Sequence, residues 1–147
     1  MSDTLASVRS AALLSILVLS LVQGCTTYRD ELSRAQNAYD ANEHERALAL
    51  TRAIEPNAPY LTVPERARYY YLRGMTDFRI GYRAEARHYL ALARAIESET
   101  PGALPTDSKN RMDETLGTLN TEVYASGISA LSAHEGEAAA PTKAKKK

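Results

Sequence analysis

The chain has 147 residues, of which 44% are hydrophobic and 24% charged, with 18 basic and 18 acidic side chains. This length fits one domain with appendages, and the hydrophobic fraction excludes a chain that is disordered throughout. The balanced charge gives no overall attraction to nucleic acid or acidic lipid, and a single cysteine excludes an internal disulfide framework and a cysteine-based metal site.

The chain begins with an apolar leader. Residues 11–22 contain ten apolar side chains in twelve positions, after a short polar start that carries Arg9. A membrane-spanning helix needs about 20 apolar residues, so this run is too short to span a bilayer and fits the apolar region of a secretory signal. We therefore expect the leader to contribute nothing to the fold.

The leader ends in Leu21-Val22-Gln23-Gly24-Cys25, which places the single cysteine directly after it. This sequence resembles the lipobox of bacterial lipoproteins, in which a small residue precedes the cysteine and an aliphatic residue stands three positions before it. The resemblance implies that Cys25 takes a covalent diacylglyceryl lipid and that residues 1–24 are removed. Residues 25–27 then form the lipidated anchor and a short linker. The alternatives are an uncleaved anchor and an ordinary signal followed by an incidental cysteine.

The residue after the cysteine bears on location. In lipoproteins of this family an Asp at that place often signals retention in the inner membrane, and Thr26 stands there in this chain. The resemblance therefore implies the outer membrane, with the domain on the periplasmic side.

Proline positions leave two long stretches free to form helices. Residues 26–55 and 65–100 contain no proline, which breaks helix interiors, and apolar residues recur at helical spacing within and after them. The spacing predicts helices over 28–41, 43–54, 64–80, 83–97 and 107–123. No segment alternates with a period of two and β-branched residues, so the expected fold class is all-α.

Local signals place the ends of these helices. Asn42 is the expected cap of the second helix, Pro64 begins the third, Gly81 ends it, and Asp107 or Ser108 caps the fifth. The composition beyond residue 127 cannot bury a core, which predicts a helical domain over 28–126 and a disordered, Lys-rich tail over 127–147.

The third and fourth helices carry small and large residues in a regular order. The positions from Ala67 to Thr100 that show it are Tyr70, Gly74, Phe78, Gly81, Ala86, Leu90 and Ala93. This pattern resembles the tetratricopeptide (TPR) repeat, a 34-residue helix hairpin. The match departs at Arg73, where Leu is usual, and at Asp77, where Tyr is usual.

A weaker copy of the pattern covers Tyr28 to Pro59. Its Ala35, Tyr39 and Ala47 stand 39 residues before Gly74, Phe78 and Ala86, while Thr51 and Ile54 replace the large and small residues. The resemblance implies two antiparallel hairpins followed by a capping helix, whose polar outer face covers the end of the stack and keeps it soluble. The alternative is a generic helical bundle.

In the TPR family the inner surface of the first helices commonly receives an extended peptide or a partner helix. Carried over place by place, the predicted partner-binding groove consists of Arg68, Tyr71, Met75, Phe78 and Arg79 from the better copy, and Arg29, Leu32, Gln36 and Tyr39 from the weaker one. Tyr and Arg are common interface anchors. The alternative is that Tyr71, Met75 and Phe78 face the capping helix as core.

Other features are weaker. Residues 65–94 hold seven arginines against three acids, which predicts a basic surface, and Tyr69-Tyr70-Tyr71 predicts at least one exposed ring. The three histidines have no metal-ligand spacing, and no nucleophile elbow or phosphate loop is present. We expect no enzyme activity, no nucleic-acid or small-molecule partner, and no cofactor besides the lipid on Cys25.

These observations favour a lipoprotein adaptor that holds a protein partner of an envelope-spanning assembly, for example in secretion, pilus formation, motility or outer-membrane biogenesis. The alternative is a structural envelope lipoprotein that associates with cell wall or anionic lipid through its basic surface and Lys tail.

Overall fold

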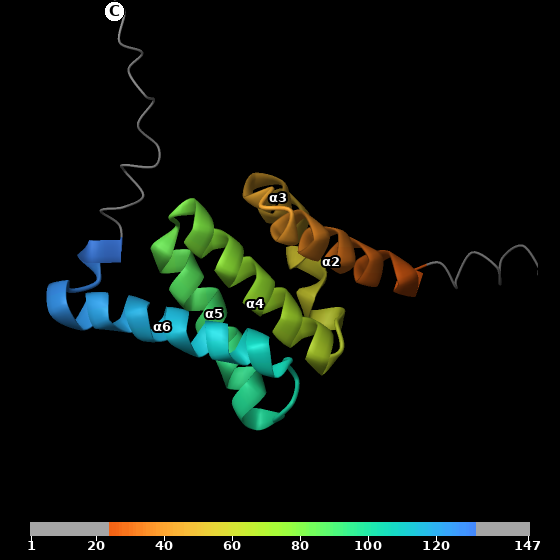
Figure 1. Ribbon diagram of the computed structural model, residues 1–147. Coiled ribbons are helices and arrows are strands. Elements are labelled where there is room, and N and C mark those ends of the chain that lie inside the picture. Colours follow the sequence, from red (N-terminus) through yellow and green to blue (C-terminus); the bar gives the residue numbers. More distant parts are fainter. Residues whose placement is uncertain (1–23, 132–147) are drawn as a thin grey trace, which may run out of the picture.

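The computed structural model describes residues 24–131, which form five α-helices and one short 3-10 helix (Figure 1). In chain order these are α2 (Gly24–Asp40), α3 (His44–Ile54), η1 (Glu55–Tyr60), α4 (Val63–Ile80), α5 (Arg83–Glu99) and α6 (Thr106–Ser126). No strand occurs in residues 24–131, so the all-α prediction is confirmed. The predicted signal peptide up to Gln23 and the tail from Ser132 lie outside the described residues.

Two helix hairpins and a crossing helix make up the domain. Short turns join α2 to α3 and α4 to α5, so each pair runs antiparallel, and α6 lies across the second pair (Figure 1). Helix α4 contacts α2, α3, α5 and α6, which makes it the centre of the fold.

The central place of α4 explains why it is buried on almost every side. Its first tyrosine, Tyr69, is fully buried, Tyr71 is 5% exposed and Tyr70 is half-buried. The expectation of an exposed ring in this triplet is therefore wrong, because α4 has neighbours on several faces rather than on one.

The helices of the second hairpin approach closely at Gly74. A Cβ atom at this position would lie 2.7 Å from Leu90 Cγ and 3.0 Å from the Leu90 backbone nitrogen. Ala86, Leu90 and Ala93 of α5 are fully buried. The small-and-large order in the sequence thus corresponds to tight contact between α4 and α5.

The starts of α3 and α4 differ from the predicted helix caps. Asn42 has a left-handed φ of 61° and lies in the turn after α2, while Glu43 precedes α3 without a side-chain cap. Asn tolerates this conformation better than most residues, so its role here is in the turn. Thr62 and Glu65 form a capping box at the start of α4, a motif visible in the sequence that the helix prediction did not use.

The domain is longer than predicted at both ends. Helix α2 begins at Gly24, so residues 25–27, predicted as a linker, are helical, and Leu131, beyond the predicted boundary at 126, is 2% exposed and packs in the core. Helix α6 begins at Thr106, ahead of the expected caps at Asp107 or Ser108.

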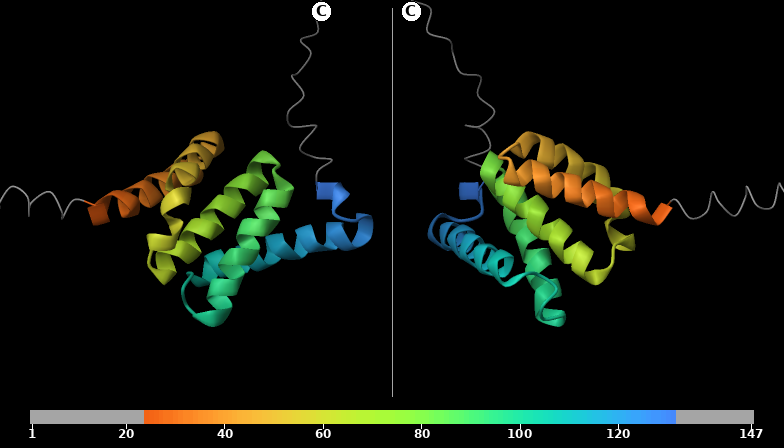
Figure 2. Two further views of the ribbon diagram at one scale, coloured as in Figure 1. Left: turned by 180° about the vertical axis from the view of Figure 1, so that it is seen from behind. Right: turned by 45° about the vertical axis from the view of Figure 1, so that its right-hand side comes forward.

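In both views of Figure 2 the beginning of α2 and the C-terminal end of α6 lie on opposite sides of the molecule. Among the described residues, none of the helices combines the length and hydropathy needed to cross a bilayer.

Candidate partner-binding site

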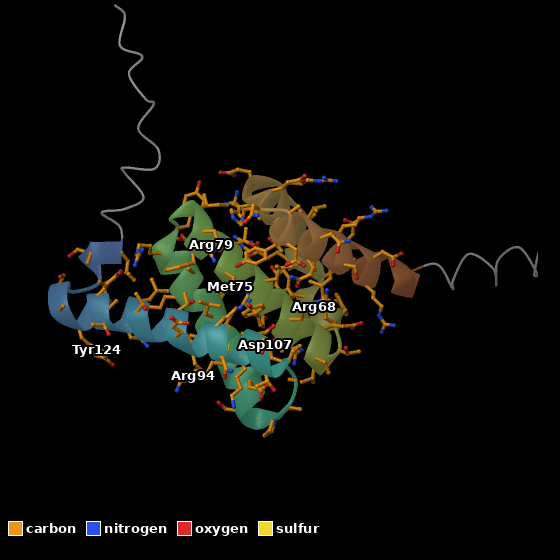
Figure 3. The ribbon with its side chains drawn as sticks, viewed as in Figure 1. Arg68, Met75, Arg79, Arg94, Asp107 and Tyr124 are labelled. Atoms are coloured by element: carbon orange, nitrogen blue, oxygen red, sulfur yellow. The ribbon has the colours of Figure 1, made fainter. Side chains whose placement is uncertain are left out.

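A groove of about 430 Å³ opens between α4 and α6. Its lining residues are Met75, Phe78, Arg79, Arg111, Glu114, Thr115 and Thr118. Figure 3 shows Met75 and Arg79 along the same side of α4, with Arg68 further toward its N-terminus. Three of the residues predicted for the groove, Met75, Phe78 and Arg79, thus meet here.

The structure buries the middle of the predicted groove. Tyr71 and Met75 are 5% and 4% exposed, and the Thr115 hydroxyl of α6 lies 3.7 Å from Met75 Sδ as a donor. Burial raises the pKa of the Tyr71 hydroxyl. These two side chains are packed within the domain, so they offer little surface to a partner, as in the alternative that places the capping helix over them.

The exposed part of the predicted groove lies toward the C-terminal end of α4. Phe78 is half-buried and Arg79 is exposed, and the Arg83 guanidinium lies 5.3 Å from the Phe78 ring centroid. Arg68 is half-buried, and none of Arg68, Arg79 and Arg111 takes part in an ion pair within residues 24–131. An aromatic edge beside unpaired guanidinium groups is therefore available to a ligand.

The residues predicted from α2 divide in the same way. Leu32 and Tyr39 are 1% and 8% exposed and belong to the core. Arg29 is exposed and its Nε lies 2.8 Å from Glu65 Oε1, which ties α2 to the start of α4. Gln36 donates to Asp40 on the same helix at 3.0 Å. None of the four residues predicted from α2 lines the groove between α4 and α6.

Helix α6 supplies groove residues that the sequence analysis missed. Arg111, Glu114 and Thr118 line the groove and are exposed. The predicted helical face of α6 consisted of its apolar residues, and the polar residues beside them gave no signal until the crossing of α6 over α4 was known.

A buried polar cluster lies on the other flank of α4. Arg73 Nε donates to Asp77 Oδ2 at 2.9 Å, and Arg73 Nη1 donates to Glu55 Oε2 at 3.2 Å. The Tyr89 hydroxyl donates to Glu55 Oε1 at 2.7 Å, and the Arg73 guanidinium lies 4.6 Å from the Tyr89 ring centroid. The cluster joins η1, α4 and α5, and its two central residues are the two departures from the TPR pattern.

The environment of this cluster shifts several pKa values. Burial raises the pKa of Asp77 to about 6, against the attraction of Arg73, and Asp77 Oδ1 has no hydrogen-bond partner. Burial raises the pKa of Tyr89 to about 12. The hydrogen bond from Tyr89 lowers the pKa of Glu55. Arg73 therefore has one carboxylate partner, Glu55, that stays ionised when Asp77 takes up a proton.

Contacts within the domain engage four of the seven arginines of residues 65–94. Arg73 is buried, Arg83 pairs with Glu122, and Arg87 donates to Asn120. Arg94 lies 3.7 Å from Asp113. The arginines of this stretch without such a contact are Arg66, Arg68 and Arg79.

Within residues 24–131 no group of three or more His, Cys, Asp or Glu side chains is arranged to hold a metal ion. Comparisons with protein-family models, with curated proteins and with solved structures found no match to this chain.

Proposed function

We propose that this protein is a lipid-anchored, non-enzymatic adaptor of the bacterial outer membrane, facing the periplasm, that holds a protein partner of an envelope-spanning assembly. The anchor is Cys25, acylated after removal of residues 1–24. Since α2 begins at Gly24, no linker separates this cysteine from the first hairpin. The domain would be held close to the membrane surface by the N-terminal end of α2.

The arrangement of the helices supports a TPR-like architecture. Two antiparallel hairpins stand in sequence, small residues lie where α4 and α5 meet, and α6 follows where a third repeat would begin. Proteins with such repeats expose a concave surface that receives a peptide or a helix. The α4–α6 groove is the open part of that surface in this chain.

The observation that carries the proposal is the groove itself. Its lining combines half-buried Phe78 with exposed Glu114 and Thr118 and with Arg79 and Arg111, which have no ion-pair partner in the described residues. A partly apolar floor with a polar margin is the usual composition of a protein interface. The buried state of Tyr71 and Met75 moves the expected contact from the middle of α4 to its C-terminal end.

The test is capture of partners from native envelopes by the full-length lipoprotein. Phe78→Ala with Arg79→Glu should abolish recovery of a specific protein while the helical circular dichroism signal persists. The matched control, Tyr60→Ala with Lys109→Glu, changes an exposed aromatic residue and an exposed cation outside the groove and should leave recovery unchanged. Equal recovery by both variants would contradict the adaptor site.

The anchor is tested separately by a Cys25→Ser variant. Wild-type protein should incorporate labelled fatty acid and stay with the detergent phase on fractionation, and the variant should do neither. Lipid incorporation by the variant would contradict the proposed acylation site.

A further inference from the structure

A second concave surface lies between α5 and α6, and we call it the α5–α6 trough. Its volume is about 510 Å³. Seven residues of α5 line it, namely Ser98 and Ala84, Arg87, His88, Ala91, Arg94 and Ala95, and Leu116 and Asn120 line it from α6. It shares no residue with the α4–α6 groove. The trough follows four turns of α5, from residue 84 to residue 98, a length of about 21 Å.

The charge of the trough is one-sided. Arg87, His88 and Arg94 line it, and no Asp or Glu does. Arg87 is held in place by its hydrogen bond to Asn120 at 2.8 Å, and the contact from Arg94 to Asp113 is long, at 3.7 Å. The floor between these side chains consists mainly of alanines, which leave room for a chain to lie close to α5.

After α6 the chain turns back toward the beginning of α5, where Ala84 lines one end of the trough. Gly127 has a left-handed φ of 78°, as Gly81 has 102° in the turn between α4 and α5. Ala130 then donates to Gly127 and Leu131 donates to Ile128, and Leu131 is fixed in the core. In both views of Figure 2 the last described residues lie beside the beginning of α5 and above the end of α6.

The residues that follow have the composition that the trough requires. The segment 132–140 reads Ser-Ala-His-Glu-Gly-Glu-Ala-Ala-Ala, in which the two acids are Glu135 and Glu137 and the other residues are mostly small. Nine residues span at most about 30 Å when extended, which exceeds the length of the trough.

We propose that residues 132–140 lie in the α5–α6 trough of the same chain, with the carboxylates of Glu135 and Glu137 against Arg87, His88 and Arg94. In this position the segment follows α6 as the second arm of a third hairpin. It covers the face of α5 that lines the trough. The proposal differs from the disordered tail that composition predicts, because composition takes no account of a neighbouring surface. The proposal does not depend on the adaptor function, because the trough and the groove are separate surfaces.

Zero-length crosslinking with a carbodiimide tests the contact, because it joins a lysine only to a carboxylate that touches it. Ala91→Lys places an amine in the middle of the trough, and Ala95→Lys serves as a second position should the first variant fail to fold. Ala49→Lys, at an exposed alanine of α3, is the matched control. The variants are studied as full-length lipoprotein in detergent, as a mixture of ¹⁴N- and ¹⁵N-labelled chains.

The expected product joins the introduced lysine to Glu135 or Glu137 within one chain, and it is absent from the α3 control. Arg87→Glu with Arg94→Glu should lower its yield about fivefold to tenfold at unchanged helicity, because two surface ion pairs are lost. Absence of the product at both trough positions, or equal yield from the α3 control, would overturn the proposal. Products that join only ¹⁴N to ¹⁵N chains would also overturn it, since a second copy would then occupy the trough.

Discussion

The two hairpins achieve close helix packing with different side chains at places 39 residues apart. In hairpin α4–α5, Gly74 lies against Leu90. In hairpin α2–α3 the corresponding residues are Ala35 for Gly74 and Thr51 for Leu90, and all four residues are buried. Thr51 satisfies its hydroxyl by donating to the carbonyls of Ala47 and Leu48 in its own helix. The second hairpin thus combines the smallest residue with a large one, whereas the first has two residues of intermediate size at the corresponding places.

The hairpins differ more strongly in whether charged side chains are buried at equivalent places. Arg73 and Asp77 are buried as a pair in α4, with side chains 5% and 0% exposed. The equivalent places in α2 hold Arg34, whose side chain is 67% exposed and paired with Glu31, and Ala38, which is buried. Arg73 lies on the flank of α4 that packs against η1 and α5, where its buried guanidinium is held by the buried Asp77 and by the exposed Glu55.

The largest expected effect comes from breaking the buried pair on one side. Arg73→Ala should lower the free energy of unfolding by about 3–5 kcal/mol at pH 7, because it leaves the Asp77 carboxylate buried without a partner. Arg34→Ala, the equivalent change in the first hairpin, should stay within about 0.5 kcal/mol. Urea unfolding of both variants measures the difference, and equal losses would contradict the contrast between the hairpins.

Removing both charges sharpens the same comparison. In the double variant Arg73→Leu with Asp77→Ala, residue 77 becomes an alanine like Ala38 at the equivalent place in α2. No buried charge is then left without a partner. We expect this double variant to be more stable than Arg73→Ala, since a buried pair is costly to break but adds little over apolar packing. A double variant that is less stable than the single one would show that the cluster stabilises the fold beyond charge pairing.

Overfilling the contact between α4 and α5 should have the next largest effect. Gly74→Ala should cost about 1–2 kcal/mol, because its Cβ would meet Leu90 at 2.7 Å and the gain in helix propensity offsets only part of the strain. Combining it with Leu90→Thr reproduces the Ala–Thr pair of the first hairpin. The loss in the double variant should be smaller than the sum of the two single losses in a double-mutant cycle, and strict additivity would argue against the pairing described above.

The buried carboxyl of Asp77 in the second hairpin predicts that the stability of the protein depends on pH. The pKa of Asp77 is raised from 3.8 to about 6 in the folded protein, so folding favours its protonated form. Its contribution to stability is complete below about pH 4 and is lost as the pH rises through 6, which amounts to about 1 kcal/mol between pH 5 and pH 7. The pKa values of Glu55, Glu65 and Glu97 are lowered, so these groups lose their contributions at pH values below this window.

Asp77→Asn is the matched variant for that pH dependence, because it keeps the shape of the protonated side chain. The change in unfolding free energy between pH 5 and pH 7, measured by denaturant titration, should be smaller in the variant than in the wild type by about 1 kcal/mol. An identical change in both proteins would mean that Asp77 does not titrate in this window.

The smallest expected difference concerns the helix starts of the two hairpins. Thr62→Ala should cost about 1 kcal/mol, because Thr62 and Glu65 form a capping box at the start of α4. Glu43→Ala at the start of α3, where no side-chain cap exists, should change thermal stability little. A Thr62→Ala variant with unchanged melting temperature would show that the tertiary contacts of α4 make the cap redundant.

The sequence predicted the helices because apolar spacing, proline and glycine act locally, and it placed Gly74 and Leu90 at a close contact through their sizes. It did not predict that Arg73 and Asp77 form a pair, although their spacing of four residues on one helix was visible, because the burial of that face depends on η1 and α5 as neighbours. The predicted groove failed in part for the same reason. Whether Tyr71 lies in a groove or under a helix depends on the angle at which α6 crosses α4, and no local pattern encodes that angle.

The most direct test of the central claim, that the α4–α6 groove holds a protein partner, is site-specific photocrosslinking in intact cells. A photoreactive residue at Thr118, which lines the groove, is compared with one at Thr121, an exposed threonine of the same helix outside it. The account predicts that Thr118 yields a crosslink to one envelope protein and that Phe78→Ala with Arg79→Glu removes it, while Thr121 yields none. Equal crosslinks from both positions, or none from Thr118, would contradict it.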